Sequence, residues 1–260
     1  MKVYLDTNIW YYLGADKILR DLLRDLPLQV TLVNLTEIGT TKNLIGANPD
    51  VIRNCIHEML ELKKEFDLTS PFHQLALSKL DIGPIQTDPH EPLLGFIRKI
   101  DNGLRFEGET KKRFYNLQQM ARSPFEKIAA AITNYTMKVY KDKKIRTELE
   151  NNSSKQSTWN LACWFVKEAH NIDMTGATSE NVNFFLFTFD AFLRHLCFNG
   201  RKMRGNDFSD LMNMAYVNPG DKYLTADNFM LKKIKEADVD DFLINDPKIL
   251  HRIQWIQRKI

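Results

Sequence analysis

The stretch VYLDTN at residues 3–8 decides the fold class, because an apolar run begins three residues into the chain and ends abruptly on polar side chains. A short continuous apolar run is typical of a strand that is buried on both faces of a parallel sheet. We therefore predict a strand over residues 3–5. Asp6 then either caps the following segment or binds a positively charged ligand.

The next segments indicate a β-α-β unit. Apolar side chains recur at helical spacing over residues 16–26, and a proline then stops the run. LQVTLVN at residues 28–34 is typical of a second strand, with Glu37 directly after it. Two strands joined by a helix imply a parallel sheet. Another helix is predicted from residue 49 to about residue 66.

The end of the chain repeats this arrangement. KYLTAD at residues 222–227 predicts a strand that ends on Asp227, followed by a helix. NDFSDLMNMAYV at residues 206–217 predicts a helix that places Asp207 and Asp210 one turn apart. The expected fold is therefore α/β, with a central parallel sheet.

The middle of the chain, residues 68–204, is predicted to be mostly α-helical. Ser123 and Glu126 form a capping box with Pro124 at the first helical position, which predicts that a helix begins there. Other helices are expected at residues 111–121, 157–170 and 181–198, and a loop at residues 81–92. We therefore predict a discontinuous core, residues 1–67 and 205–260, interrupted by a large helical insertion.

The composition indicates a packed globular protein, since 43% of the 260 residues are hydrophobic and 16 are Phe. No secretory signal is visible, and the longest strongly apolar run, FFLFTF at residues 184–189, is too short to span a bilayer. We expect a cytoplasmic protein without membrane association. Cys55, Cys163 and Cys197 lack paired spacing, which argues against a disulfide framework or a zinc site.

Four carboxylates are expected to converge at the carboxyl ends of the strands, where open parallel sheets bind ligands. Asp6, Glu37 and Asp227 follow strands, and Asp210 joins them from a helix. Crowded carboxylates raise one another's pKa unless cations neutralise them, and oxygen ligands suit Mg²⁺ or Mn²⁺. Because such ions bind phosphate oxygens and activate water, the predicted chemistry is phosphodiester hydrolysis.

These motifs together resemble the PIN-domain nucleases, a family that includes toxins of bacterial toxin-antitoxin pairs. The resemblance lies in VYLDTN, in Glu37, in DLMNMA at residues 210–215 and in YLTAD at residues 223–227. It implies a PIN-like three-layer fold and Mg²⁺- or Mn²⁺-dependent endoribonuclease activity. The residues that match the family's acidic metal positions are Asp6, Glu37, Asp210 and Asp227, and those that match its polar supporting positions are Asn8 and Thr225.

The resemblance leaves two features open. The helical stretch is far longer than in the compact toxins of the family, and we expect it to bind substrate or a partner. Asp207 and Asp210 compete for the third acidic position. We prefer Asp210, because small Ala215 follows it as the family pattern expects, and keep Asp207 as an auxiliary metal ligand.

The charge distribution indicates where a nucleic acid would bind. Residues 68–204 contain 20 Lys and Arg against 14 Asp and Glu, a balance of +6, whereas the rest of the chain contains 16 against 19, a balance of −3. A basic cluster lies directly before the acidic helix and is predicted to contact substrate phosphates, or else is a solvated loop. Its members are Arg194, Arg201, Lys202 and Arg204.

Three functions therefore remain open. The first is a metal-dependent endoribonuclease that acts as a toxin, stress or phage-defence effector, for which an inhibitor protein (antitoxin) is a candidate partner. The second is a structure-selective DNA nuclease with the same acids, and the third is a non-catalytic RNA-binding or scaffold protein. RNA is preferred to DNA as the partner, and a homodimer is compatible with the sequence.

Overall fold

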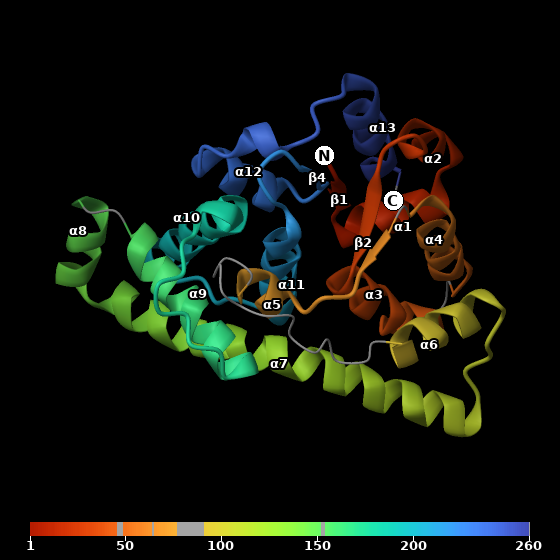
Figure 1. The fold of residues 1–260 in the computed structure, drawn as a ribbon, viewed down its shortest axis with the longest axis horizontal. Coiled ribbons are helices and arrows are strands. Elements are labelled where there is room, and N and C mark those ends of the chain that lie inside the picture. Colours follow the sequence, from red (N-terminus) through yellow and green to blue (C-terminus); the bar gives the residue numbers. More distant parts are fainter. Residues whose placement is uncertain (46–48, 64, 77–90, 152–153, 260) are drawn as a thin grey trace.

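The computed structural model describes residues 1–45, 49–63, 65–76, 91–151 and 154–259, and it shows an α/β fold around a parallel sheet (Figure 1). The predicted α/β class and the parallel sheet are confirmed. The order of the strands is β3-β2-β1-β4, and all neighbours pair in parallel. The strands are β1 (Val3–Leu5), β2 (Leu28–Thr31), β3 (Glu65–Asp67) and β4 (Lys222–Leu224).

The winding of the sheet reverses at β1. From β1 the chain proceeds to β2 and β3 on one side, and it later returns to place β4 on the other side of β1. Ligand crevices of open parallel sheets lie at such a switch point, outside the carboxyl ends of the strands. Here the switch point lies where β1 and β4 end, at Asp6 and Thr225.

Two hydrophobic clusters cover the two faces of the sheet. Alternating side chains of β1 point to opposite faces, so Val3 and Leu5 belong to the first cluster and Tyr4 belongs to the second. Helix α3 (Leu32–Gly39) contributes to both. The helices of the first cluster are α1 (Thr7–Ala15), α2 (Lys17–Leu23), α4 (Pro49–Leu62), α6 (Glu91–Asp101) and α13 (Pro247–Gln257). Those of the second are α5 (Pro71–Ala76), α9 (Lys155–His170), α10 (Asn183–Asn199), α11 (Gly205–Asn213) and α12 (Asn228–Glu236).

The middle segment shares its hydrophobic core with the sheet. Helix α7 (Gly108–Lys141) runs along one side of the molecule, from α6 to α8 (Lys143–Asn151) (Figure 1). It contributes Phe114 to the first cluster and Ala129 to the second. Short 3₁₀ turns complete the described elements: η1 (Lys42–Ile45), η2 (Glu180–Val182), η3 (Met214–Tyr216) and η4 (Asp240–Phe242). Within the described ranges, no helix is both long and apolar enough to cross a membrane.

The predicted helix start at Ser123 is wrong, because Pro124 lies inside the continuous helix α7. An interior proline removes one backbone hydrogen bond and costs about 3 kcal/mol. Helix α7 packs against both α10 and α11, and this tertiary packing outweighs the local preference for a helix start. The two helices predicted on either side of Ser123 are therefore one.

Two boundaries near the sheet also differ from the prediction. The second strand ends at Thr31 and not at residue 34, because the Thr31 hydroxyl accepts a hydrogen bond from the backbone N–H of Asn34 and caps α3. The helix predicted to about residue 66 ends at Leu62, and β3 follows it at the edge of the sheet. β3 is half exposed and has no continuous apolar run, so its sequence carries no clear strand signal.

Two further segments also differ from the prediction. The helix predicted at residues 206–217 ends at Asn213 and continues as the turn η3. Most of the loop predicted at residues 81–92 lies outside the described residues, but its last two residues already belong to α6. Glu91 and Pro92 open that helix, and proline suits a first helical turn because its missing N–H would have no helical partner there.

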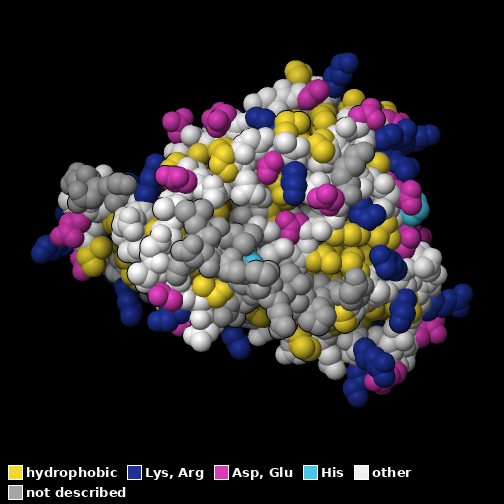
Figure 2. Space-filling view, in the orientation of Figure 1, with side chains coloured by type: hydrophobic (Ala, Val, Ile, Leu, Met, Phe, Trp, Pro, Cys, Tyr) yellow, Lys and Arg dark blue, Asp and Glu magenta, His cyan; other side chains and the backbone are white. Residues whose placement is uncertain are grey.

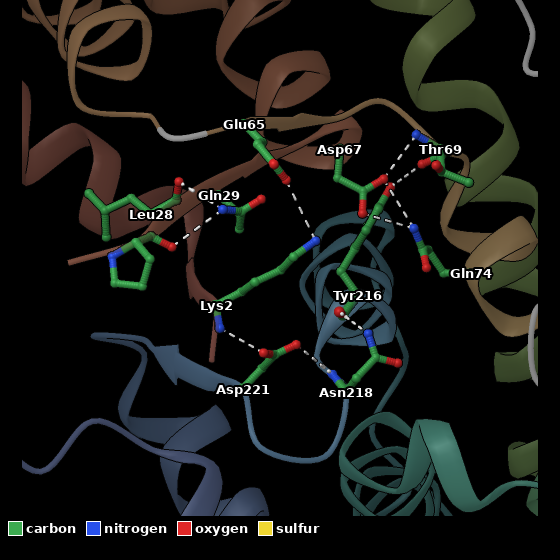
Figure 3. A network of polar contacts seen from close by, with 11 residues as sticks. Lys2, Leu28, Gln29, Glu65, Asp67, Thr69, Gln74, Tyr216, Asn218 and Asp221 are labelled. Atoms are coloured by element: carbon green, nitrogen blue, oxygen red, sulfur yellow. Dashed lines mark hydrogen bonds and ion pairs between the residues drawn. The ribbon is translucent and has the colours of Figure 1, made fainter.

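Polar contacts hold the edge strands in place (Figure 3). The backbone N–H of Lys2 donates to Asp221 Oδ1 at 2.7 Å, while Lys2 Nζ lies 3.7 Å from Glu65 Oε2. The Tyr216 hydroxyl donates to the Thr69 carbonyl at 2.6 Å. These contacts connect the segments around β3 and β4, which lie on opposite sides of β1.

Candidate active site

Asp6 lies at the switch point of the sheet and is 1% exposed. Its backbone N–H donates to the Leu224 carbonyl at 2.9 Å, which continues the pairing of β1 with β4. Its Oδ2 accepts hydrogen bonds from Thr225 Oγ1 at 2.6 Å and from Asn8 Nδ2 at 3.4 Å. Its Oδ1 is buried without a partner among the described residues. A buried carboxylate oxygen in this state is unfavourable unless it is protonated or meets a cation.

Glu37 reaches the same place from α3. The prediction put it directly after the second strand, but it lies in the second turn of the helix, because the strand ends at Thr31. The Thr7 hydroxyl donates to Glu37 Oε2 and itself accepts from Asn34 Nδ2 at 3.2 Å. The Asn34 amide also donates to the Leu5 carbonyl at 3.2 Å. This buried chain of hydrogen bonds fixes Glu37 relative to the end of β1.

Asp210 and Asp227 come from two helices of the second cluster. Asp210 lies on α11, and Asp227 caps α12 by accepting from the N–H groups of Phe229 at 2.7 Å and Met230 at 2.9 Å. Both capping bonds use Oδ1, so Oδ2 is the oxygen that Asp227 has left for a ligand. The cap and a site role are therefore compatible.

A cavity of about 400 Å³ opens at these acids. Glu37, Asp207, Asp210 and Asp227 line it together with Asn8. Tyr11, Arg204 and residues of α7 complete the wall. The described part of the chain therefore brings the four predicted acids to one place, with Asp6 buried beside the cavity.

Burial and mutual repulsion shift the pKa values of these acids. Burial raises the pKa of Asp6 to about 6; the charges of Glu37 and Asp227 add to this, and the hydrogen bond from Thr225 opposes it. Burial raises the pKa of Glu37, although the Ser209 and Thr7 hydroxyls lower it. Burial also raises the pKa of Asp210 well above its ordinary value, with further contributions from Asp6 and Glu37. The cluster therefore favours bound protons or bound cations.

The arrangement is not a ready-made metal site. In the described residues, no three His, Cys, Asp or Glu side chains are placed to hold one ion together. Asp6 Oδ2, Glu37 Oε2 and Asp227 Oδ1 are each engaged in hydrogen bonds within the protein. The donor set nevertheless fits a divalent cation, because it consists of oxygen ligands and includes the unpartnered Oδ1 of Asp6.

Asp207 has a structural role that Asp210 lacks. Its Oδ2 accepts from the backbone N–H of Arg204 at 2.9 Å, at the start of α11, and Arg201 lies 3.8 Å from its Oδ1. An acid in this position stabilises the helix N-terminus. Asp207 also lines the cavity, whereas Asp210 is the acid whose pKa responds to all of its acidic neighbours.

The predicted basic cluster is divided by the fold. Arg204 lines the acidic cavity, Arg201 lies beside Asp207 with its guanidinium 4.4 Å from the Phe229 ring centroid, and Lys202 is exposed. Arg194 lines a different cavity and donates to the Leu149 carbonyl at 2.9 Å. Sequence reasoning missed Arg122, which reaches the acidic cavity from α7, because no local motif marks it.

In the metal-free protein, we expect protonation of Asp6 to stabilise the fold at low pH. The pKa of Asp6 is about 6 in the folded protein against an ordinary value of 3.8, so the folded state holds a proton that the unfolded chain releases. This contribution is complete below about pH 4 and is lost as the pH rises through about 6. Denaturant unfolding in a chelator should show wild type losing roughly 1–3 kcal/mol more than Asp6→Asn over this range. Parallel profiles would contradict the assignment.

Fold and site together define an α/β protein with a carboxylate-lined cavity at the switch point of a parallel sheet. No protein-family model matches this chain, and no curated protein or solved structure is significantly similar to it. The functional interpretation therefore rests on the residues of the cavity and on their contacts.

Proposed function

We propose that this protein is a Mg²⁺- or Mn²⁺-dependent nuclease that hydrolyses RNA internally. The observation that carries the proposal is the buried Asp6, whose Oδ1 has no partner among the described residues and whose charge is coupled to three other acids. A protein that keeps such repulsion at the switch point of its sheet gains from a ligand that neutralises it. A divalent cation has the charge and the preference for oxygen ligands that this position requires.

The residues at the cavity would have different roles in the reaction. Asp6, Glu37, Asp210 and Asp227 would hold the cation, while the Thr225 hydroxyl keeps Asp6 in position. Bound Mg²⁺ or Mn²⁺ would supply positive charge to the phosphodiester oxygens and activate water for attack on phosphorus. The acids themselves repel a polyanion, so nearby cationic side chains must attract the substrate.

The face of the molecule drawn in Figure 2 carries charges of both signs. Figure 2 shows Lys and Arg side chains interspersed with Asp and Glu over the visible face. Arg204 in the cavity wall and Arg201 beside Asp207 are therefore the members of the predicted basic cluster best placed to contact a bound strand. Arg194 and Lys202 have no comparable position.

RNA is the proposed substrate because VYLDTN, Glu37, the helix from Asp210 and YLTAD resemble the corresponding motifs of the PIN-domain nucleases. The test is to incubate purified protein and Mn²⁺ with an RNA strand and with the DNA strand of the same sequence. We expect cleavage of RNA only, abolished by a chelator. A single 2′-deoxy substitution at the mapped scissile nucleotide then shows whether the 2′-hydroxyl is required. Equal cleavage of RNA and DNA would favour the DNA-nuclease alternative, and cleavage of neither would overturn the proposal.

A further inference from the structure

One positively charged side chain that lines the acidic cavity comes from the middle of the chain, from helix α7. Arg122 of α7 is half-buried and lines the cavity together with Glu37, Asp210 and Asp227. Among the described residues it makes no hydrogen bond and no ion pair. Its charge acts on two half-buried groups of the cavity: burial raises the pKa of Glu37 and of Tyr11, and the charge of Arg122 opposes this. As far as the described residues are concerned, the donors of this guanidinium remain available to a ligand.

A hydrogen bond connects one side of α7 to the C-terminal end of α3, the helix that carries Glu37. Gln118 is buried, and its Nε2 donates to the carbonyl of Thr40 at 2.5 Å. Thr40 is the C-terminal cap of α3. Gln118 and Arg122 lie four residues apart and so share a face of α7. The face that carries Arg122 is therefore held against the end of α3.

The next turn of α7 is fastened to the helix that carries Asp210. Phe125 packs against Phe208 of α11, with ring centroids 5.9 Å apart. At the start of α11, a Cβ added to Gly205 would lie 3.0 Å from Glu126 Cγ, so the two helices approach closely there. Figure 1 shows α7 passing beneath α3 and α11 in this region. Arg122 is thus held between two anchors, one on each acidic helix.

We propose that Arg122 is the residue that binds the substrate phosphate in this cavity, opposite the acids that would hold the metal. This inference rests on the proposed nuclease function and adds a residue to it. A planar guanidinium matches the non-bridging oxygens of a phosphodiester and can bind two of them at once. In a cavity whose acids repel polyanions, an anchored arginine that has no hydrogen-bond or ion-pair partner in the described part of the chain supplies the attraction that substrate binding needs.

The test measures binding of a short fluorescent single-stranded RNA to full-length protein in an Asp6→Asn background, which prevents cleavage. Arg122→Gln should weaken binding roughly tenfold or more, the loss expected for one charge-assisted phosphate contact. The slope of log affinity against log salt concentration should fall by about 0.7, the value for one phosphate contact of a single strand. Arg122→Lys should keep the slope and recover only part of the affinity.

Lys127→Gln is the matched control, since Lys127 is an exposed cation on the same helix that does not line the cavity. It should leave RNA affinity close to that of its parent. An Arg122→Gln protein that binds RNA with unchanged affinity and slope would overturn the inference and leave the nuclease proposal intact. The inference would also be overturned if Arg122→Gln lost its metal-induced stabilisation but kept its RNA affinity, because Arg122 would then act on the metal site through Glu37 and not on the substrate. Failure of the Asp6→Asn protein to bind RNA, together with failure of wild type to cleave it, would overturn both.

Discussion

Asp6→Asn should lower the rate of RNA cleavage by roughly three orders of magnitude or more, the loss typical when one member of a catalytic unit is removed. Asparagine keeps the size of the side chain and one acceptor oxygen for the Thr225 hydroxyl, but it cannot carry the negative charge that a divalent ion needs. The fold should survive, because the substitution removes a buried charge that three acids repel. Single-turnover cleavage and a thermal melt of the same preparation measure both effects.

Asp50→Asn is the control for this experiment, since the Asp50 side chain lies on α4 and is 86% exposed. It should cleave at the wild-type rate. An Asp6→Asn protein that is folded and fully active would contradict the proposed site.

The same assay distinguishes the other acids. Asp210→Asn and Asp227→Asn should also abolish cleavage, and asparagine at 227 keeps the capping bonds to α12, so a loss there is not a loss of the cap. Asp207→Asn should have a smaller effect, because Asp207 stabilises the start of α11. An inactive Asp207→Asn together with an active Asp210→Asn would reverse the assignment of the third acid.

The second large effect expected is stabilisation by metal. A ligand that binds only the folded state at about one hundred times its Kd adds about 2.7 kcal/mol to the free energy of unfolding. For a chain of this length this corresponds to a rise in Tm of roughly 5–10 °C. Mn²⁺ or Mg²⁺ should produce this shift in wild type, because the ion relieves the repulsion among Asp6, Glu37, Asp210 and Asp227. Calorimetry with and without metal measures it.

Asp6→Asn should lose most of the metal-induced shift, and Asp50→Asn should keep it. Equal shifts in wild type and Asp6→Asn would place the metal elsewhere on the protein. Because this measurement needs no substrate, it tests the metal site even if the preferred nucleic acid has not been found.

Local sequence patterns were sufficient to predict three of the four strands and the acids that follow them, but not the edge strand β3. VYLDTN and KYLTAD each place a buried strand directly before polar side chains, and parallel strands bring such ends together whatever the rest of the chain does. The convergence of Asp6 and Asp227 follows from those two strands. Strand β2 ends earlier than predicted, so Glu37 lies on α3 and not directly after the strand. It still lines the cavity, because α3 begins directly at the carboxyl end of β2.

Only the tertiary structure decided which distant groups share the cavity and where the long helix runs. The local sequence at Pro124 favours a helix start, but α7 continues without a break past Pro124 because it packs against α10 and α11. That continuity brings Arg122 to the acids, while Arg194, close to them in sequence, turns into another cavity. Successive residues of a helix point in different directions around its axis, and the helix can pack on either side of a core. Long-range packing, and not proximity in the sequence, therefore determines which side chains reach a site.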